Sequence, residues 1–309
     1  MPPGFNLNGC SGQADVLSTF KDGAETMQDF GAQTRAFAAR IETELDTGHL
    51  NFPTSMDISL RIKQLADDPD SSIEDIVAVV RAEPVLSAKV IRMANAMLLN
   101  PYGAHITSVN NAVRRIGLAA LRCLAFAVAA EQLIQDHRSP QLRKIAAQLW
   151  RHSADVASWA YAFAHYLRAV NPDTAMLAGM MTDIGQFFLL ARVGDYPALE
   201  GDFARFAEFV SVWNTPISRA VLEAFELPED IIDALDDDGP YSGGWPPEEL
   251  HNIVRVATLA AEERNPFSHL HKNGPGAEND DPGIDKAQFA SLLEETRAGK
   301  EAMLHAVHG

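Results

Sequence analysis

The chain has 309 residues, 47% of them hydrophobic, which is enough for one large domain or two of ordinary size. Its 42 acidic and 25 basic residues give a formal net charge of −17, so nucleic acid and anionic membranes are poor candidates as partners, because both are bound mainly through Lys and Arg. The longest apolar run, Leu118–Ala130, is interrupted by Arg122 and is shorter than the roughly 20 residues of a membrane-spanning helix, so we expect no membrane segment.

The N-terminus and the cysteines indicate the compartment. The first ten residues lack a basic region followed by an apolar stretch, so we expect no secretory signal peptide. Cys10 and Cys123 are the two cysteines, too few for a disulfide framework. We therefore expect a soluble protein of the reducing cytoplasm, in which Cys123 is a buried structural thiol.

The N-terminal extension, 1–49, divides into two stretches. Residues 1–24 are rich in Gly, Pro, Asn and Ser and are expected to be poorly ordered. Residues 25–46 carry apolar side chains near helical spacing, which predicts a helix that could serve as a docking arm or form a homodimer. The apolar positions of this predicted helix are Met27, Phe30, Phe37, Ile41 and Leu45.

A first group of helices is predicted over 50–138. Ser72, followed by Asp75, predicts a capped helix start, and Pro84 stands at the first position of the next helix, where its missing N–H is tolerated. Leu118–Leu133 is apolar on nearly all sides and is expected at the centre of the bundle. The other predicted boundaries are a stop at Asp68-Pro69 and a short helix from Ser108, as its cap, to Gly117.

A second group is predicted over 139–266. A long helix covers about 141–170, and the next helix opens at Pro172 and is interrupted at Asp183-Ile184-Gly185. Further helix starts are predicted at Pro216, Pro228 and Pro246. The chain shows no strand-like alternation of useful length, so the predicted fold class is all-α, a two-part helical bundle.

The last segment, 267–309, is predicted to be an addition to these bundles. Residues 268–283 have the composition of a linker and include His269 and His271. We expect this histidine pair to be exposed, and such a pair is more often incidental than functional. An amphipathic helix is expected over 284–307.

One pair of residues suggests chemistry. His152 lies on the long helix, and Asp183 follows about thirty residues later, a separation that a helix, a turn and a second helix can close. A histidine and an aspartate that face each other in a bundle could bind a divalent metal and activate water. By spacing alone, a satisfied core histidine and a helix-capping aspartate are the more common interpretation.

Longer motifs make the sequence resemble the HDOD family, the HD-related output domains of bacterial signalling proteins. The resemblance runs from about Phe52 to Pro266 and is carried by four ordered stretches. They are Glu83–Asn95, Ile106–Leu118, Leu149–Ser153 (LWRHS) and Leu177–Gly185 (LAGMMTDIG). The resemblance implies an all-helical fold whose second half, 139–266, is HD-like.

The resemblance also implies where a metal site would lie. HD phosphohydrolases use a first His, a His-Asp doublet and a later Asp, and His152 and Asp183 match the first His and the Asp of the doublet. Thr182 stands at the doublet's His and Thr258 at the later Asp. A threonine hydroxyl is a weak ligand beside imidazole or carboxylate, so we expect no bound metal or other cofactor and no hydrolase activity.

Two acidic features accompany this set. Asp236-Asp237-Asp238 stands where the family has a His pair, and Asp236 and Asp237 could supply cleft oxygens to a hard cation, although such runs are usually solvated. Arg151 and Asp155, four positions apart on the long helix, read as a surface ion pair.

The resulting hypothesis is a non-catalytic output or scaffold protein that acts through protein contacts. By resemblance, its partners would be other signalling proteins, such as regulators of two-component or cyclic-di-GMP circuits. Two alternatives stay open: a small-molecule or nucleotide sensor that uses the former HD cleft, and a divergent metal-dependent phosphohydrolase.

Overall fold

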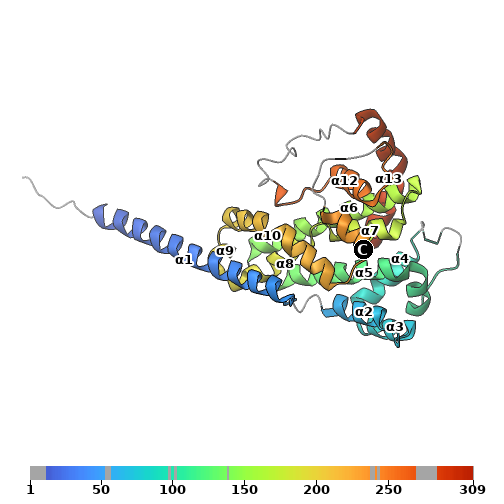
Figure 1. The fold of residues 1–309 in the computed structure, drawn as a ribbon, viewed down its shortest axis with the longest axis horizontal. Coiled ribbons are helices and arrows are strands. Elements are labelled where there is room, and N and C mark those ends of the chain that lie inside the picture. Colours follow the sequence, from blue (N-terminus) through green and yellow to red (C-terminus); the bar gives the residue numbers. More distant parts are fainter. Residues whose placement is uncertain are drawn as a thin grey trace, which may run out of the picture.

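The structure is a computed structural model that describes residues 12–52, 57–96, 99–100, 103–137, 139–236, 241, 244–268 and 284–308. Within these residues the regular structure is entirely helical, which confirms the predicted fold class (Figure 1). Cys10, Asp237, Asp238, the His269/His271 pair and most of the predicted linker lie outside the described residues.

The first helices follow the local signals of the sequence closely. They are α2 (Asp57–Asp67), α3 (Ile73–Ala82), α4 (Pro84–Ala94) and α5 (Val109–Asp136). Ser72 and Asp75 form the predicted capping box at the start of α3, with Ser72 N–H donating to Asp75 at 2.8 Å. Ser108 stands at the start of α5, but its side chain makes no capping bond there, so that part of the prediction was wrong.

A kink divides α5 where the sequence predicted a helix end. Gly117 has φ 77° and ψ 175°, a conformation that is strained for any residue with a Cβ. The segment after the kink is buried at the centre of the molecule, with Leu121, Cys123 and Leu124 fully inaccessible to solvent. The predicted central helix is therefore the second part of α5.

The second group of helices carries the histidine and the aspartate. It comprises α6 (Pro140–Leu167), α7 (Pro172–Met181), α8 (Ile184–Arg192), a 3-10 turn η2 (Val193–Asp195), α9 (Pro197–Glu200), α10 (Phe203–Ala224), α11 (Glu229–Asp236) and α12 (Leu250–Ala260). A Cβ at Gly179 would lie 2.9 Å from the backbone of Ala157, so α6 and α7 approach closely because that position has no side chain.

Two of the predicted helix starts were wrong. Pro216 lies inside α10, which continues through it although the proline ring removes one backbone hydrogen bond. Pro246 follows a cis peptide bond, and α12 begins only at Leu250. Pro228 directly precedes α11, as predicted.

The N-terminal extension is more helical than expected. A single helix, α1 (Gly12–Thr47), begins within the stretch that was predicted to be poorly ordered, and its N-terminal part extends away from the body (Figure 1). Its C-terminal part is docked: Phe37 stacks on Tyr196 and Phe209 at centroid distances of 4.5 and 4.8 Å. Buried Glu44 accepts a hydrogen bond from buried Arg192 at 2.6 Å.

The two predicted bundles share a core. One cluster of buried side chains runs from Phe37 through α5 to Val307, and a smaller one joins α6, α12 and the C-terminal helix α13 (Lys286–His308) around Trp159. The halves at 50–138 and 139–266 are therefore parts of one packed unit, and α13 lies against α6 and α4 (Figure 1).

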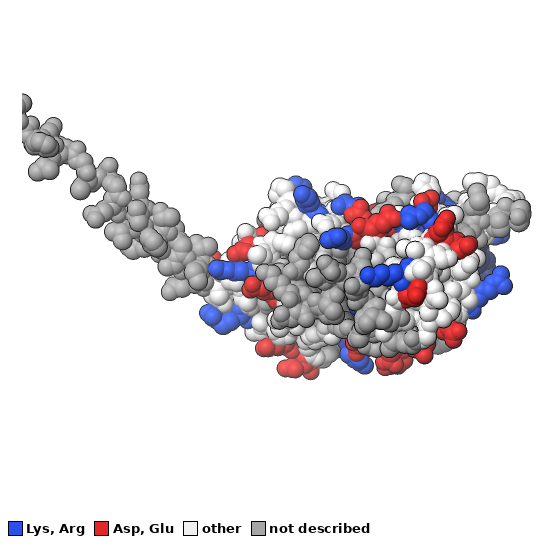
Figure 2. Space-filling view, turned by 90° about the horizontal axis from the view of Figure 1, so that it is seen from above, with Lys and Arg blue, Asp and Glu red and all other residues white. Residues whose placement is uncertain are grey.

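Two stretches pass a length and hydropathy test for membrane spans. They are Val109–Asp136 and Pro172–Asp195, and 67% and 83% of their most apolar windows are buried inside the protein. Such burial is also typical of core helices in a globular protein, so the test is weak evidence for a membrane. On the face seen in Figure 2, described acidic and basic side chains are interspersed, without a continuous basic surface.

Candidate functional site

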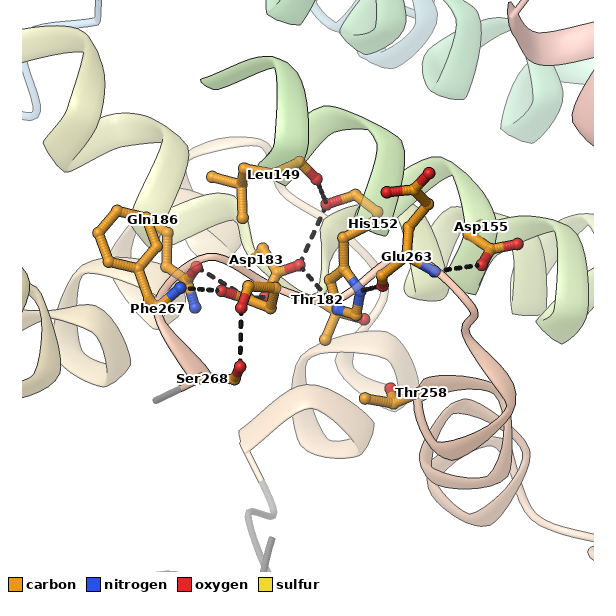
Figure 3. Close-up of polar contacts among 12 residues, drawn as sticks. Leu149, His152, Asp155, Thr182, Asp183, Gln186, Thr258, Glu263, Phe267 and Ser268 are labelled. Carbon is orange, nitrogen blue, oxygen red and sulfur yellow. Dashed lines mark hydrogen bonds and ion pairs between the residues drawn. The ribbon is translucent and has the colours of Figure 1, made fainter. Parts of the chain in front are cut away.

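His152 and Asp183 are brought together by three helices. His152 projects from α6, and Asp183 lies in the short break between α7 and α8 (Figure 3). The distance between His152 Nε2 and Asp183 Oδ2 is 3.6 Å, and both side chains are buried. The close contact of α6 with α7 at Gly179 places these two segments side by side.

His152 is oriented from its other nitrogen. Nδ1 lies 2.6 Å from the backbone oxygen of Glu263, in the loop 261–268 that follows α12. We call this loop the covering loop. A carbonyl oxygen only accepts hydrogen bonds, so Nδ1 carries the proton of this contact and Nε2 faces the carboxylate of Asp183.

Both oxygens of Asp183 are occupied by donors of the protein. Ser153 Oγ lies 3.1 Å from Oδ2, and Asn265 donates its side-chain amide to Oδ1 at 2.8 Å. Burial raises the pKa of the Asp183 carboxyl above its ordinary value, although His152, Ser153 and Asn265 act in the opposite direction. The carboxylate is thus buried, and it accepts hydrogen bonds from two neighbouring side chains.

Asn265 is itself held in place. Its amide nitrogen also donates to Gln186 on α8 at 2.9 Å, and its side-chain oxygen accepts the backbone N–H of Phe267 at 2.7 Å. Ser268 donates to the backbone oxygen of Asn265 at 2.8 Å. The covering loop therefore fixes an amide group against Asp183.

Thr182 and Thr258 use their hydroxyls within their own segments. Thr182 donates to the backbone oxygen of Ala178 at 3.2 Å, and Thr258 donates to that of Val254 at 3.0 Å. Figure 3 shows Thr258 set apart from His152 and Asp183. Each hydroxyl is therefore engaged by a backbone oxygen four positions earlier in the chain.

Asp236, one of the two possible cleft acids, is used elsewhere. It forms an ion pair with Arg219 of α10, so the end of α11 is bound to α10 through this carboxylate. Asp237 belongs to the residues that are not described.

The predicted surface pair Arg151–Asp155 was wrong. Asp155 is 2% exposed, and its Oδ2 accepts the backbone N–H groups of Glu262 and Glu263 at 2.6 and 3.1 Å. Its Oδ1 lies 2.8 Å from Nζ of Lys300 on α13. Arg151 instead lies 3.5 Å from the carboxylate of Glu263. Asp155 thus anchors the covering loop rather than the helix surface.

The side chains at this site do not fit a catalytic metal. Within the described part of the chain, no three His, Cys, Asp or Glu side chains gather closely enough to hold an ion. Of the four ligand positions of the family, only His152 and Asp183 carry a strong ligand here, and the two oxygens of Asp183 also accept hydrogen bonds from Asn265 and Ser153.

Sequence reasoning missed Asn265 and the inward role of Asp155. The only local signal at Asn265 is the following proline, and Asn-Pro indicates a turn without saying what the asparagine contacts. Its partner Asp183 is 82 positions away, and Asp155 contacts Glu262 across 107 positions.

An all-helical core that sets a histidine of one helix against an aspartate between two others has the architecture of an HD-type domain. The chain belongs to the HDOD domain family, whose pattern matches residues 52–237, more than half of the sequence. The match confirms the resemblance seen in the motifs, although it ends before α12 and the covering loop.

Solved structures share this fold. A Shewanella amazonensis protein, described as a candidate metal-dependent phosphohydrolase, has a TM-score of 0.62 and 22% identity over 88% of this chain and 99% of its own. A second protein of that organism, described as a candidate phosphohydrolase, has a TM-score of 0.53 and 20% identity over 86% and 97% of the two chains. At these identities the likeness shows the fold alone.

A sequence relative is much longer than this chain. An uncharacterised Treponema pallidum protein is 22% identical over 250 residues, which cover 74% of this chain and 44% of that protein. The chain therefore matches less than half of the length of this relative.

Proposed function

We propose that this HDOD protein takes part in signal transduction as a non-catalytic output or scaffold protein, in which the former HD site has become part of the packed core. The observation that carries the proposal is the hydrogen bond from Asn265 to Asp183, 2.8 Å long. The amide occupies Oδ1 of the carboxylate, whereas the other oxygen, Oδ2, faces His152.

The two threonines support the same proposal. The hydroxyls of Thr182 and Thr258 bond to the backbone of their own helical segments, so the two positions at which the family has a His and an Asp contribute no strong metal ligand. His152 and Asp183 alone would leave an ion with two protein ligands, fewer than the three that catalytic zinc sites keep.

Metal content and turnover test this proposal together. We expect protein purified without chelator to contain no stoichiometric zinc, iron or manganese and to leave a panel of phosphoesters and cyclic nucleotides intact. About one metal ion per chain, together with turnover that falls in a His152→Ala variant, would establish the phosphohydrolase instead.

The partners are expected among other signalling proteins, including regulators of two-component or cyclic-di-GMP circuits, in the cytoplasm. Tagged protein from the native host, analysed by mass spectrometry, should carry such a regulator at a reproducible ratio. The purified protein and the purified regulator should then bind each other directly. Failure of the two to associate would refute that regulator as a partner.

The sensor alternative predicts a different result. A nucleotide or metabolite bound beside His152 would have to displace the covering loop, and at about 100 times its dissociation constant it would add about 2.7 kcal/mol to the stability of the fold. A thermal-shift screen detects such a gain. We expect no member of a nucleotide panel to give it.

A further inference from the structure

Polar contacts attach the helix α13 to the domain at Lys300, at its C-terminal end, and at exposed Arg297, which lies 3.1 Å from the carboxylate of Glu262. One face of α13 is buried against α6 and α4, next to which it lies in Figure 1. The buried positions of this face are Leu292, Thr296, Lys300, Met303, Ala306 and Val307. The spacing is that of an amphipathic helix, but a lysine stands in the middle of the buried stripe.

Lys300 makes the first attachment. It is 4% exposed, its Nζ lies 2.8 Å from Oδ1 of Asp155, and it stands 5.3 Å above the centre of the Trp159 ring. A buried ammonium group needs its counter-charge at the matching position. Removal of either Lys300 or Asp155 would leave the other charge buried without compensation.

The C-terminal end of α13 makes the second attachment. Lys89 of α4 donates to the backbone oxygen of Val307 at 3.0 Å, and Arg92 donates to that of Ala306 at 3.3 Å. Basic groups at this end complement the partial negative charge of the helix C-terminus. The domain surface therefore recognises a helix by one internal lysine and by its terminal carbonyl groups.

This surface, which we call the α13 seat, is continuous with the covering loop. Asp155 receives Lys300 on one oxygen and the N–H groups of Glu262 and Glu263 on the other. Glu263 in turn orients His152 through its backbone oxygen, 2.6 Å from Nδ1. One buried carboxylate thus links α13 to the loop that covers His152 and Asp183.

We propose that the α13 seat is a helix-binding site that α13 occupies as an intramolecular ligand, and that emptying the seat releases the covering loop from His152 and Asp183. A helix that fits the α13 seat is amphipathic and carries a lysine about two turns before its C-terminal end. The inference deepens the proposed function and rests on it, since a protein that acts by contacts needs a surface that can exchange partners.

The connection to α13 is long enough for such exchange. Residues 269–285 separate the covering loop from α13 and contain many Gly, Pro, Asn and Asp residues. A stretch of this length spans up to about 60 Å when extended, so α13 can leave its seat without strain in the covalent chain.

The test uses the 309-residue chain with a protease site inserted at 274–277, which is cut only after folding. A fluorescent peptide of residues 284–309 is then added. We expect it to exchange with the cleaved segment, and a Lys300→Ala peptide to bind about thirtyfold more weakly, as expected for truncating one partner of a buried charge pair. A Glu301→Gln peptide, changed at an exposed position, is the matched control and should bind like the original.

Hydrogen exchange of the covering loop is the second measurement. The amides of Glu262 and Glu263 should exchange at least about tenfold faster when the cleaved helix is removed, and slow again when the peptide is added. Equal exchange rates with and without the helix would refute the link to the loop.

Three other results would contradict the proposal. Global unfolding after cleavage would make α13 an integral part of the core, and equal binding of the Lys300→Ala peptide would remove the recognition by Asp155. A dimer whose C-terminal helices are exchanged between copies would contradict the intramolecular arrangement. None of these results depends on metal content or turnover, so failure here is distinguishable from failure of the proposed function.

Discussion

Asn265 donates its side-chain amide to Oδ1 of Asp183 across 82 positions of the chain, at 2.8 Å. The same amide nitrogen lies 2.9 Å from Oε1 of Gln186, so both of its hydrogens are used. This asparagine completes the packing around Asp183, since it satisfies two buried acceptors at once.

Removal of Asn265 should therefore destabilise the fold. An Asn265→Ala variant leaves Asp183 and Gln186 without these donors, and an unsatisfied buried acceptor costs about 1–3 kcal/mol. Urea unfolding should show a loss of that size. As a control, Asn110→Ala removes only the exposed contact with Arg114 and should change the stability by less than about 0.5 kcal/mol. Equal effects of the two changes would contradict the buried role of Asn265.

Restoring the family's ligands should create a metal site. A Thr182→His/Thr258→Asp/Asn265→Gly variant supplies two ligands and removes the amide that faces Asp183. We expect it to retain a divalent ion when purified without chelator, whereas the native chain does not, as measured by elemental analysis. Adding His152→Ala to the same variant is the control and should abolish the gain. Equal metal content in the native chain, this variant and its His152→Ala derivative would refute the assignment of these positions as ligand positions.

The Glu44–Arg192 pair should make stability depend on acidity. Burial alone would raise the pKa of Glu44, but hydrogen bonds from Arg192 and Asn51 outweigh it, and the pKa lies below its ordinary value of 4.5. The stabilisation is thus fully present above pH 4.5 and is lost as the pH falls through the lower, folded-state pKa.

Urea unfolding between about pH 3 and 6 tests this dependence. A Glu44→Gln variant should be less stable at neutral pH and should lose less stability on acidification than the native chain. The control is Asp195→Asn, which removes the exposed pair with Arg40 and should leave the slope of stability against pH nearly unchanged. The same slope in the native chain and the Glu44 variant would contradict the prediction.

Gly117 should tolerate no side chain without a loss of stability. With φ at 77° inside α5, a Gly117→Ala change imposes backbone strain of about 1–3 kcal/mol, although no atom of the described residues lies within 4 Å of the added Cβ. Gly194 also has open space around its Cβ position but no positive φ, so Gly194→Ala is the matched control and should stay within about 0.5 kcal/mol. Thermal and urea unfolding would show the difference.

The sequence by itself determined the class of fold, the family and many helix boundaries. The capping box at Ser72, the prolines at positions 84 and 172, and the break at Asp183 were all predictable, because each depends on residues within one turn of the boundary. Local signals failed at Pro216 and Pro246, where tertiary packing keeps α10 continuous and delays the start of α12.

Only the tertiary structure decided what the polar residues of the site contact. A helical pattern places Arg151 and Asp155 within reach of each other. It cannot show that Asp155 instead contacts Lys300 and the backbone of the covering loop. The spacing of His152 and Asp183 made their approach plausible, whereas the amide of Asn265 came from a loop beyond every recognised motif. Hydrogen bonds between residues separated by about a hundred positions leave no periodic trace in the sequence, so their geometry was fixed only when the helices packed.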